Sequence, residues 1–174
     1  MPESAAPKLI DLIGADRERA VPVVRDGFEG IYRWHAKRTL RDIERVRGLE
    51  AGGEIVGVSM LERLLPEVGY VYYAAVLTTW RRRGQATRLL DDALEWFAGA
   101  GARVVYAAAE EDNTASLTLF RSRGFRVVER DEPRFRDGGL GAWGLRSRMR
   151  VVYGEVLLGL RLRPEPPAAP DSSA

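Results

Sequence analysis

The sequence predicts an α/β domain of the α+β type, in which helices pack on a mixed β-sheet. First, a length of 174 residues suits one domain with a single hydrophobic core. Second, Gly52-Gly53 lies between two strand-like runs and predicts an antiparallel hairpin in the first half of the chain. Third, strand-like and helix-like spacings alternate in the second half, which is typical of β-α-β crossovers.

Apolar residues define the expected elements of the first half. The run 67–77 is rich in Tyr and Val, which favour strands. Pro22 interrupts the helix-like spacing of residues 15–30, because proline has no amide hydrogen to donate inside a helix. From the N-terminus we expect a strand at 8–13, helical segments at 15–30 and 31–45, and strands at 46–51, 54–64 and 67–77.

The apolar spacing changes period after residue 86. Residues 87–97 carry an apolar stripe at helical spacing, and Gly99 and Gly101 end this predicted helix. The valine-containing run 103–109 is typical of a buried strand, and Gly124 stops a further helix. We expect helices at 87–97 and 114–123, strands at 103–109, 125–130 and 155–162, and a basic, glycine-rich loop with some helix at 133–150.

Composition excludes several kinds of protein. The chain has no cysteine and one histidine, so disulfides, cysteine nucleophiles and a metal site are not expected. No apolar run reaches the ~20 residues of a membrane helix, and the N-terminus has no signal peptide pattern. A net charge of +2 does not indicate a nucleic-acid partner. We expect a cytoplasmic protein with disordered ends at 1–7 and 164–174 and one domain at 8–163.

A predicted anion site follows the Tyr-rich strand. The strand ends near Leu77, and a helix begins near Gly84 or Gln85. The first N–H groups of a helix have no intrahelical partner and lie at the positive end of its dipole. Gly84 and Ala86 would let a phosphate approach the backbone, and the arginines at 81–83 add positive charge. The alternative is a solvated turn in which Gly84 merely starts the helix.

Two spaced signatures resemble the GCN5-related N-acetyltransferases (GNAT). The first is Arg81-x-x-Gly84-x-Ala86 with the preceding Val76-x-x-x-Trp80. The second is the segment 113–125, which has an Asn, a small residue, an aromatic residue and then Gly-Phe. One helix and one strand separate them, as in that family. The resemblance covers residues 53–131 and implies a GNAT fold: a mixed, mostly antiparallel sheet of six to seven strands flanked by about four helices.

The resemblance also implies a binding mode for acetyl-CoA as co-substrate. The strand before the phosphate loop carries a bulge and separates from the next strand, and the pantetheine arm pairs with exposed backbone groups there. One backbone N–H would stabilise the oxyanion of the thioester. The alternative is that Asn113 is a helix N-cap and Ser116 is part of a solvated turn. The predicted coenzyme-binding residues are Val76, Leu77, Thr78, Arg81, Arg82, Arg83, Gly84, Gln85, Ala86, Thr87, Asn113, Ser116 and Phe120.

The catalytic groups depart from the family pattern. Phe120 stands where many members have a tyrosine that protonates the leaving thiolate, and phenylalanine has no such proton. Relatives that acetylate ribosomal protein N-termini have a glutamate where this chain has Ala108. The candidates for the general base are therefore Glu110, Glu111 and waters ordered by Tyr72. The alternative is that both glutamates are exposed loop charges.

The resemblance implies transfer of acetyl to a primary amine by direct attack on the thioester. The acceptor would be a small molecule or a protein N-terminus, and the protein a monomer or homodimer. A low-pKa amine is the easier acceptor without an obvious base, since a lysine amine of pKa ~10.4 costs about 4 kcal/mol to deprotonate at pH 7.4. His35, Tyr32 and Trp34 either line the acceptor cleft or belong to a packed surface helix. The alternative function is an acyl-CoA-binding or regulatory module without catalysis.

Overall fold

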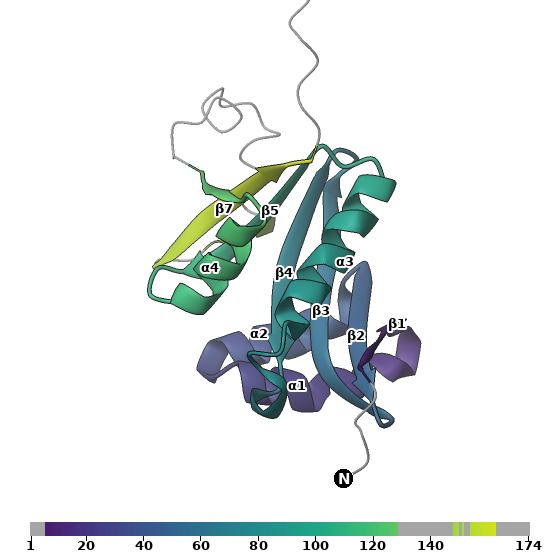
Figure 1. Cartoon of the computed structure of the whole chain (residues 1–174). Coiled ribbons are helices and arrows are strands. Elements are labelled where there is room, and N and C mark those ends of the chain that lie inside the picture. Colours follow the sequence, from purple (N-terminus) through teal and green to yellow (C-terminus); the bar gives the residue numbers. More distant parts are fainter. Residues whose placement is uncertain (1–5, 129–147, 150, 152–153, 163–174) are drawn as a thin grey trace, which may run out of the picture.

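A seven-stranded sheet organises the part of the chain that the computed structural model describes, residues 6–128, 148–149, 151 and 154–162. The strand order is β1-β2-β3-β4-β5-β7-β6 (Figure 1). β4 and β5 are parallel, and the other neighbours are antiparallel. The strands are β1 (Lys8–Asp11), β2 (Arg45–Ala51), β3 (Glu54–Leu65), β4 (Val68–Val76), β5 (Val104–Glu110), β6 (Arg126–Val127) and β7 (Glu155–Arg161).

Helices cover both faces of this sheet. Figure 1 shows α3 and α4 on one face, with α1 and α2 behind the other. The helices are α1 (Val21–Gly27), α2 (Gly30–Asp42), α3 (Gln85–Gly99) and α4 (Thr114–Ser122), with 3₁₀ turns at Gly14–Ala20 and Thr78–Trp80. The element order and the mixed, mostly antiparallel sheet agree with the sequence-based expectation.

The differences lie mainly at element boundaries. Pro22 does not interrupt a helix; it lies in the first turn of α1, where its missing amide hydrogen is not needed. The residues before it form a 3₁₀ turn instead of continuous α-helix. The predicted strand 125–130 is limited to Arg126–Val127 among the described residues. Of the ends expected to be disordered, 1–7 and 164–174, residues 1–5 and 164–174 lie outside the described residues, as does most of the 133–150 loop. Pro7 is described and is buried.

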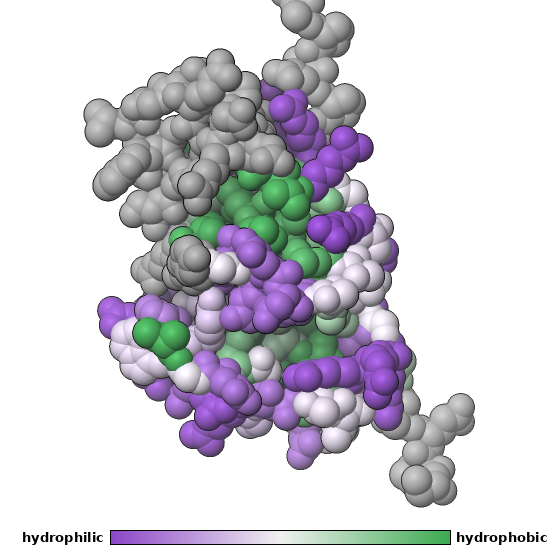
Figure 2. Space-filling model, turned by 90° about the vertical axis from the view of Figure 1, so that its left-hand side faces the viewer, coloured by the Kyte–Doolittle hydropathy of each residue, from purple (hydrophilic) through white to green (hydrophobic). Residues whose placement is uncertain are grey.

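The hydrophobic core has two layers, one on each side of the sheet. On the α3/α4 side, Phe97 and Phe120 belong to a buried cluster that also contains Leu158 of β7. On the α1/α2 side, Val24 and Leu40 pack in a cluster that also contains residues of β2 and β3. Figure 2 looks onto the side of α4 and shows hydrophilic side chains over much of the lower half, with an apolar area above them. Both faces of the sheet are thus packed against helices.

Polar contacts fix α3 against the sheet. The Arg47 guanidinium on β2 donates two hydrogen bonds to the Asp92 carboxylate on α3, at 2.8 and 2.7 Å. The two side chains are 13% and 15% exposed, so solvent screens this pair less than a surface pair. Arg88 donates to the Pro7 carbonyl at 2.8 Å and to Gln85 Oε1 at 3.1 Å. The N-terminal end of α3 is therefore held in a defined place relative to β2 and the chain before β1.

Gly69 on β4 allows α3 to lie close to the sheet. A Cβ atom at this position would lie 2.5 Å from Phe97 Cδ1, and Phe97 is fully buried. We expect Gly69→Ala to destabilise the fold by about 1–3 kcal/mol through overpacking. The midpoint of thermal unfolding should fall by about 2–4 °C per kcal/mol. Gly99→Ala is the control, because its Cβ would meet no atom within 4 Å; a Gly69→Ala midpoint equal to that of Gly99→Ala would contradict this reading.

Candidate active site

A β-bulge in β4 separates this strand from β5. The two strands pair only between residues 68–71 and 104–107. On the other side of β4, the pairing with β3 moves from Val71 to Tyr73 between neighbouring β3 residues, so Tyr72 is the extra residue. Tyr72 and Tyr73 both pack on the α1/α2 side, whereas Val71 packs on the α3/α4 side. A bulge changes the direction of side chains and ends regular pairing. It therefore explains why Tyr72 and Tyr73 lie on the same side and why the pairing of β4 with β5 stops at residue 71.

The backbone of Val76 faces the resulting gap. The Leu77 N–H donates to the Val56 carbonyl of β3 at 2.9 Å. Because successive residues of a strand direct their N–H and C=O groups to opposite edges, those of Val76 point away from β3. The Val76 carbonyl accepts from Arg81 Nε at 3.0 Å. Val76 thus has the orientation that the resemblance implies for pairing with a pantetheine arm.

Asp26 on α1 holds the start of the loop after β4. One of its carboxylate oxygens accepts from the Thr78 N–H at 2.7 Å and from the Thr78 hydroxyl at 3.0 Å. The same oxygen lies 3.6 Å from the Arg81 guanidinium. The Thr78 N–H is therefore engaged within the protein, unlike the free group that pantetheine pairing would require. Asp26 was not found by sequence reasoning, since no local pattern links it to a loop 52 residues away.

The loop residues 82–87 present unpaired N–H groups at the start of α3. Arg82 and Gly84 have φ values of 58° and 75°, in the left-handed region. The Arg88 N–H donates to the Gly84 carbonyl at 3.0 Å, but within the described chain no acceptor is recorded for the N–H groups of 82–87. A Cβ built at Gly84 would meet no atom within 4 Å, so the space beside it is open. This arrangement fits a diphosphate.

A cleft of about 1100 Å³ connects this loop with the gap between β4 and β5. Its walls come from the α1–α2 junction, β4, the start of α3, the end of β5 and α4. The predicted coenzyme residues that line it are Val76, Arg81, Arg82, Gly84, Gln85, Ala86, Thr87, Asn113, Ser116 and Phe120. Leu77, Thr78 and Arg83 do not line it. The guanidinium of Arg83 instead lies 5.3 Å from the Trp80 ring centroid, a cation–π contact.

The second signature forms the opposite wall of the cleft. The Asn113 carboxamide oxygen accepts from the Ser116 N–H at 3.0 Å and caps α4. Phe120 is 7% exposed and packs edge-on against Phe125, with ring centroids 5.1 Å apart. The N-cap interpretation of Asn113 is therefore correct. A contact of Asn113 with coenzyme stays a prediction, compatible with its place in the cleft wall.

Three tyrosines of β4 line the end of the cleft next to α1 and α2. The Tyr70 hydroxyl donates to the Met149 carbonyl at 2.8 Å, and burial raises its pKa well above the usual range. The Tyr72 hydroxyl donates to the Arg148 carbonyl. Tyr73 packs edge-on against Phe28, with ring centroids 5.2 Å apart. These hydroxyls hold residues 148–149 against β4, so Tyr72 has a structural contact besides the water-ordering role predicted for it.

The described carboxylates at this end come from three segments. Glu110 on β5 lies directly opposite Glu155 on β7, and both line the cleft, as does Glu29. The Tyr32 hydroxyl donates to Glu155 Oε1 at 3.2 Å. Burial, followed by the charges of Glu155 and Glu110, raises the pKa of Tyr32 to about 12. Glu155 was missed by sequence reasoning because it lies 123 residues from Tyr32.

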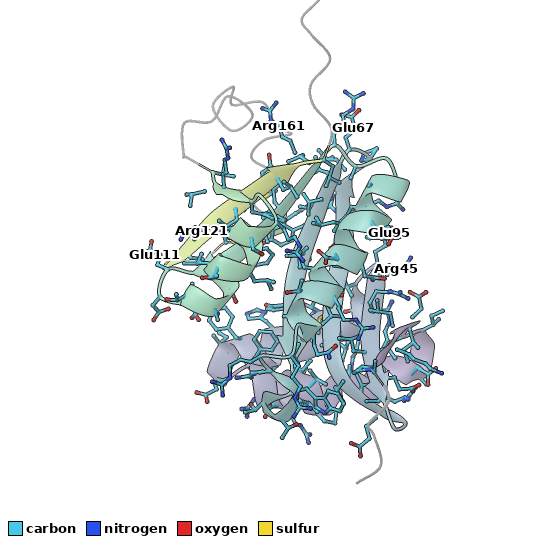
Figure 3. All side chains as sticks on the ribbon, in the orientation of Figure 1. Arg45, Glu67, Glu95, Glu111, Arg121 and Arg161 are labelled. Carbon is cyan, nitrogen blue, oxygen red and sulfur yellow. The ribbon has the colours of Figure 1, made fainter. Side chains whose placement is uncertain are left out.

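Glu111 lies outside the cleft. Its side chain is exposed, and Figure 3 shows it at the outer edge of the molecule. Its backbone N–H donates to the Gly154 carbonyl at 2.9 Å. Trp34 is also outside, 57% exposed, whereas Tyr32 and His35 on the same helix line the cleft. The structure thus places Glu110 in the cleft wall and Glu111 outside the cleft, whereas the sequence analysis treated the two as equal candidates.

Neither a metal site nor a membrane helix is found in the described part of the chain. No three His, Asp or Glu side chains there gather as metal ligands would. None of its helices is long and apolar enough to cross a membrane.

Gly84 provides a test of the diphosphate site. Gly84→Glu would place a carboxylate beside the free N–H groups, so acetyl-CoA binding, measured by isothermal titration calorimetry, should fall below detection. Gly53→Glu is the matched control: Gly53 also has a left-handed φ, 85°, and open space at its Cβ, but lies in the β2–β3 hairpin. Unchanged acetyl-CoA affinity in Gly84→Glu would refute the assignment of the loop.

Comparison with known sequences gives consistent matches. Residues 14–125 match the model of the acetyltransferase (GNAT) family. The N-alpha-acetyltransferase RimI of Mycobacterium tuberculosis (strain ATCC 25618 / H37Rv) is 30% identical over 142 residues, 78% of this chain and 88% of that protein. A mycothiol acetyltransferase of Corynebacterium glutamicum (strain R) is 32% identical over 78 residues, 45% of this chain and 27% of that protein.

Solved structures share the fold at low sequence identity. The ribosomal-protein-S18-alanine N-acetyltransferase from Escherichia coli has a TM-score of 0.68 and 15% identity, covering 94% of this chain and 98% of its own. A GNAT family acetyltransferase from Elizabethkingia anophelis with acetyl-CoA bound has a TM-score of 0.67 and 15% identity, covering 91% and 99%. With the family model covering most of the sequence, the chain belongs to the GNAT acetyltransferase family and is an acetyl-CoA-dependent N-acetyltransferase.

Proposed function

We propose that this enzyme acetylates the α-amino group at the N-terminus of a peptide or protein. The observation that carries the proposal is the opposite charge of the two ends of the cleft. Arg81 and Arg82 lie at the end with the free N–H groups, whereas Glu29, Glu110 and Glu155 lie at the other. The first end suits the diphosphate of acetyl-CoA, and the second suits a cationic amine.

The gap between β4 and β5 would join these two ends. Acetyl-CoA would lie with its diphosphate at residues 82–87 and its pantetheine arm along Val76, which brings the thioester toward the bulge at Tyr72. The acceptor amine would enter from the α1/α2 side, where Tyr32 and Glu155 line the cleft. Catalysis would come from holding the two reactants together and from a backbone N–H of β4 that stabilises the oxyanion.

The choice of an α-amino group rests on the low pKa of such amines and on the activity named for a similar protein. An α-amino group of pKa ~7.8 is neutral for about a quarter of the time at pH 7.4, whereas a lysine amine is neutral about one time in a thousand. The similar M. tuberculosis protein is an N-alpha-acetyltransferase by name. A small-molecule amine is the second candidate, because a mycothiol acetyltransferase matches part of the chain. Cytoplasmic location, monomeric or homodimeric state and domain limits of 8–163 remain predictions.

A thiol-release assay tests the acceptor class. Peptides with a free N-terminus and no lysine should release CoA thiol from acetyl-CoA at least about 10-fold faster at pH 7.4 than N-blocked peptides with one lysine. The ratio should shrink toward pH 10 as lysine becomes neutral. Fastest reaction with lysine side chains, polyamines or a small amine would refute the proposal. Mass spectrometry of the product would locate the acetyl group.

A further inference from the structure

We propose that Glu155, oriented by Tyr32 and facing Glu110, receives the ammonium group of the acceptor and takes its proton before attack. This inference rests on the proposed function and assigns residues to its proton-transfer step. None of these three residues belongs to the two signatures at 76–86 and 113–125. The role follows from contacts that the fold makes between α2, β5 and β7.

The two carboxylates form a cross-strand pair. Glu110 and Glu155 are paired in the antiparallel register of β5 and β7, on the same face of the sheet as Tyr106 and Leu157 and opposite to α3 and α4. Like charges directly opposite each other destabilise a sheet. A cation held between them would remove this repulsion. The protonated acceptor amine is such a cation, and it must enter this end of the cleft to reach the thioester.

Tyr32 gives Glu155 a fixed orientation. Its hydroxyl donates to Glu155 Oε1 at 3.2 Å from the first turns of α2. With a pKa raised to about 12, Tyr32 keeps its proton throughout the neutral range, so it acts as a donor. Glu155 is half-buried, whereas Glu110 is exposed. The more enclosed and better-held carboxylate is thus Glu155.

Other ionisable groups around this end are less suited to the role. The Tyr70 and Tyr72 hydroxyls donate to the backbone carbonyls of residues 149 and 148. The Arg148 guanidinium pairs with Glu62 at 2.9 Å and does not line the cleft. Glu29 and His35 line the cleft from α2 and its N-cap, and no described residue donates a hydrogen bond to either side chain.

The acceptor nitrogen loses two protons during the reaction, and its new C–N bond replaces the C–S bond of the thioester. The acceptor enters as an ammonium ion and transfers one proton to Glu155, which becomes a neutral carboxylic acid. The neutral nitrogen attacks the thioester carbon, the C–N bond forms, and the C–S bond then breaks to release CoA thiolate. The nitrogen loses its second proton as the amide forms, and one proton ends on the CoA sulfur through solvent. Glu155 returns its proton to solvent before the next turnover.

Glu155→Gln keeps the shape of the side chain and removes the proton acceptor. Wild-type kcat/KM for a free N-terminal peptide should stay nearly level between pH 6.5 and the amine pKa of ~7.8. The variant should instead follow the neutral fraction of the amine. Its deficit should therefore be about 100-fold at pH 6.5 and about 10-fold or less at pH 8.5. Acetyl-CoA affinity should match that of the wild type, and thermal stability should not fall, because the variant removes the repulsion between residues 110 and 155.

Further variants test whether Tyr32 acts by orienting Glu155. Glu95→Gln is the control, because Glu95 is exposed on α3 away from the cleft, and it should retain wild-type kinetics at both pH values (Figure 3). Tyr32→Phe should lower kcat/KM about 10-fold, the value of one hydrogen bond to a charged group. The double variant Tyr32→Phe/Glu155→Gln should be no slower than Glu155→Gln alone, because Tyr32 acts through Glu155.

Several outcomes would overturn the proposal. Glu155→Gln within twofold of wild type at pH 6.5, or with the same deficit at both pH values, would remove the proton-acceptor role. Losses that multiply in the double variant would remove the orienting role of Tyr32. If the wild type acetylates lysine side chains and not free N-termini, the proposed acceptor is wrong. The same variants, assayed with lysine peptides, would then still decide the role of Glu155.

Discussion

The functional architecture depends on hydrogen bonds that β4 and β5 do not make with each other. Past residue 71, the facing edges of two parallel strands separate inside a sheet whose faces are covered by helices. Unpaired backbone groups at a strand edge are costly when buried and prone to unwanted pairing when exposed. Here the gap opens into a cleft, where an extended ligand would be able to pair with the edge. The contacts of Arg47 with Asp92 hold α3 in place around this opening.

Local signals explain why so much could be predicted from the sequence. A helix that begins after a glycine, an Asn that caps the next helix and a Gly-Phe ending are properties of short segments, and they survive in any tertiary setting. The start of α3 after Gly84 and the cap of α4 at Asn113 follow directly from them, whereas their common place in the cleft wall was implied by the family resemblance. The element order was equally accessible, because the apolar spacing changes from period two to period 3.6 along the chain.

Long-range contacts explain what the sequence did not reveal. Asp26 reaches a loop 52 residues away, and Tyr32 reaches Glu155 across 123 residues. No spacing rule connects such positions. The distinction between Glu110, which lines the cleft, and Glu111, which does not, could have been predicted from a local signal. Side chains alternate along a strand, so Glu110 shares its face with Tyr106, while its neighbour does not. The end of β5 was harder to predict: the strand was expected to end at residue 109, and it ends at Glu110. The alternation of side chains was therefore not extended to Glu110.

The extra residue in β4 makes the enzyme unusually sensitive to chain length at one point. Removal of Tyr72 would leave Val71 and Tyr73 opposite consecutive residues of β3, which restores a regular ladder without moving the rest of the sheet. A straightened strand could continue alongside β5 and close the opening. A single codon deletion here would therefore close the opening for the coenzyme, and it would also remove the hydroxyl that holds the Arg148 carbonyl against β4.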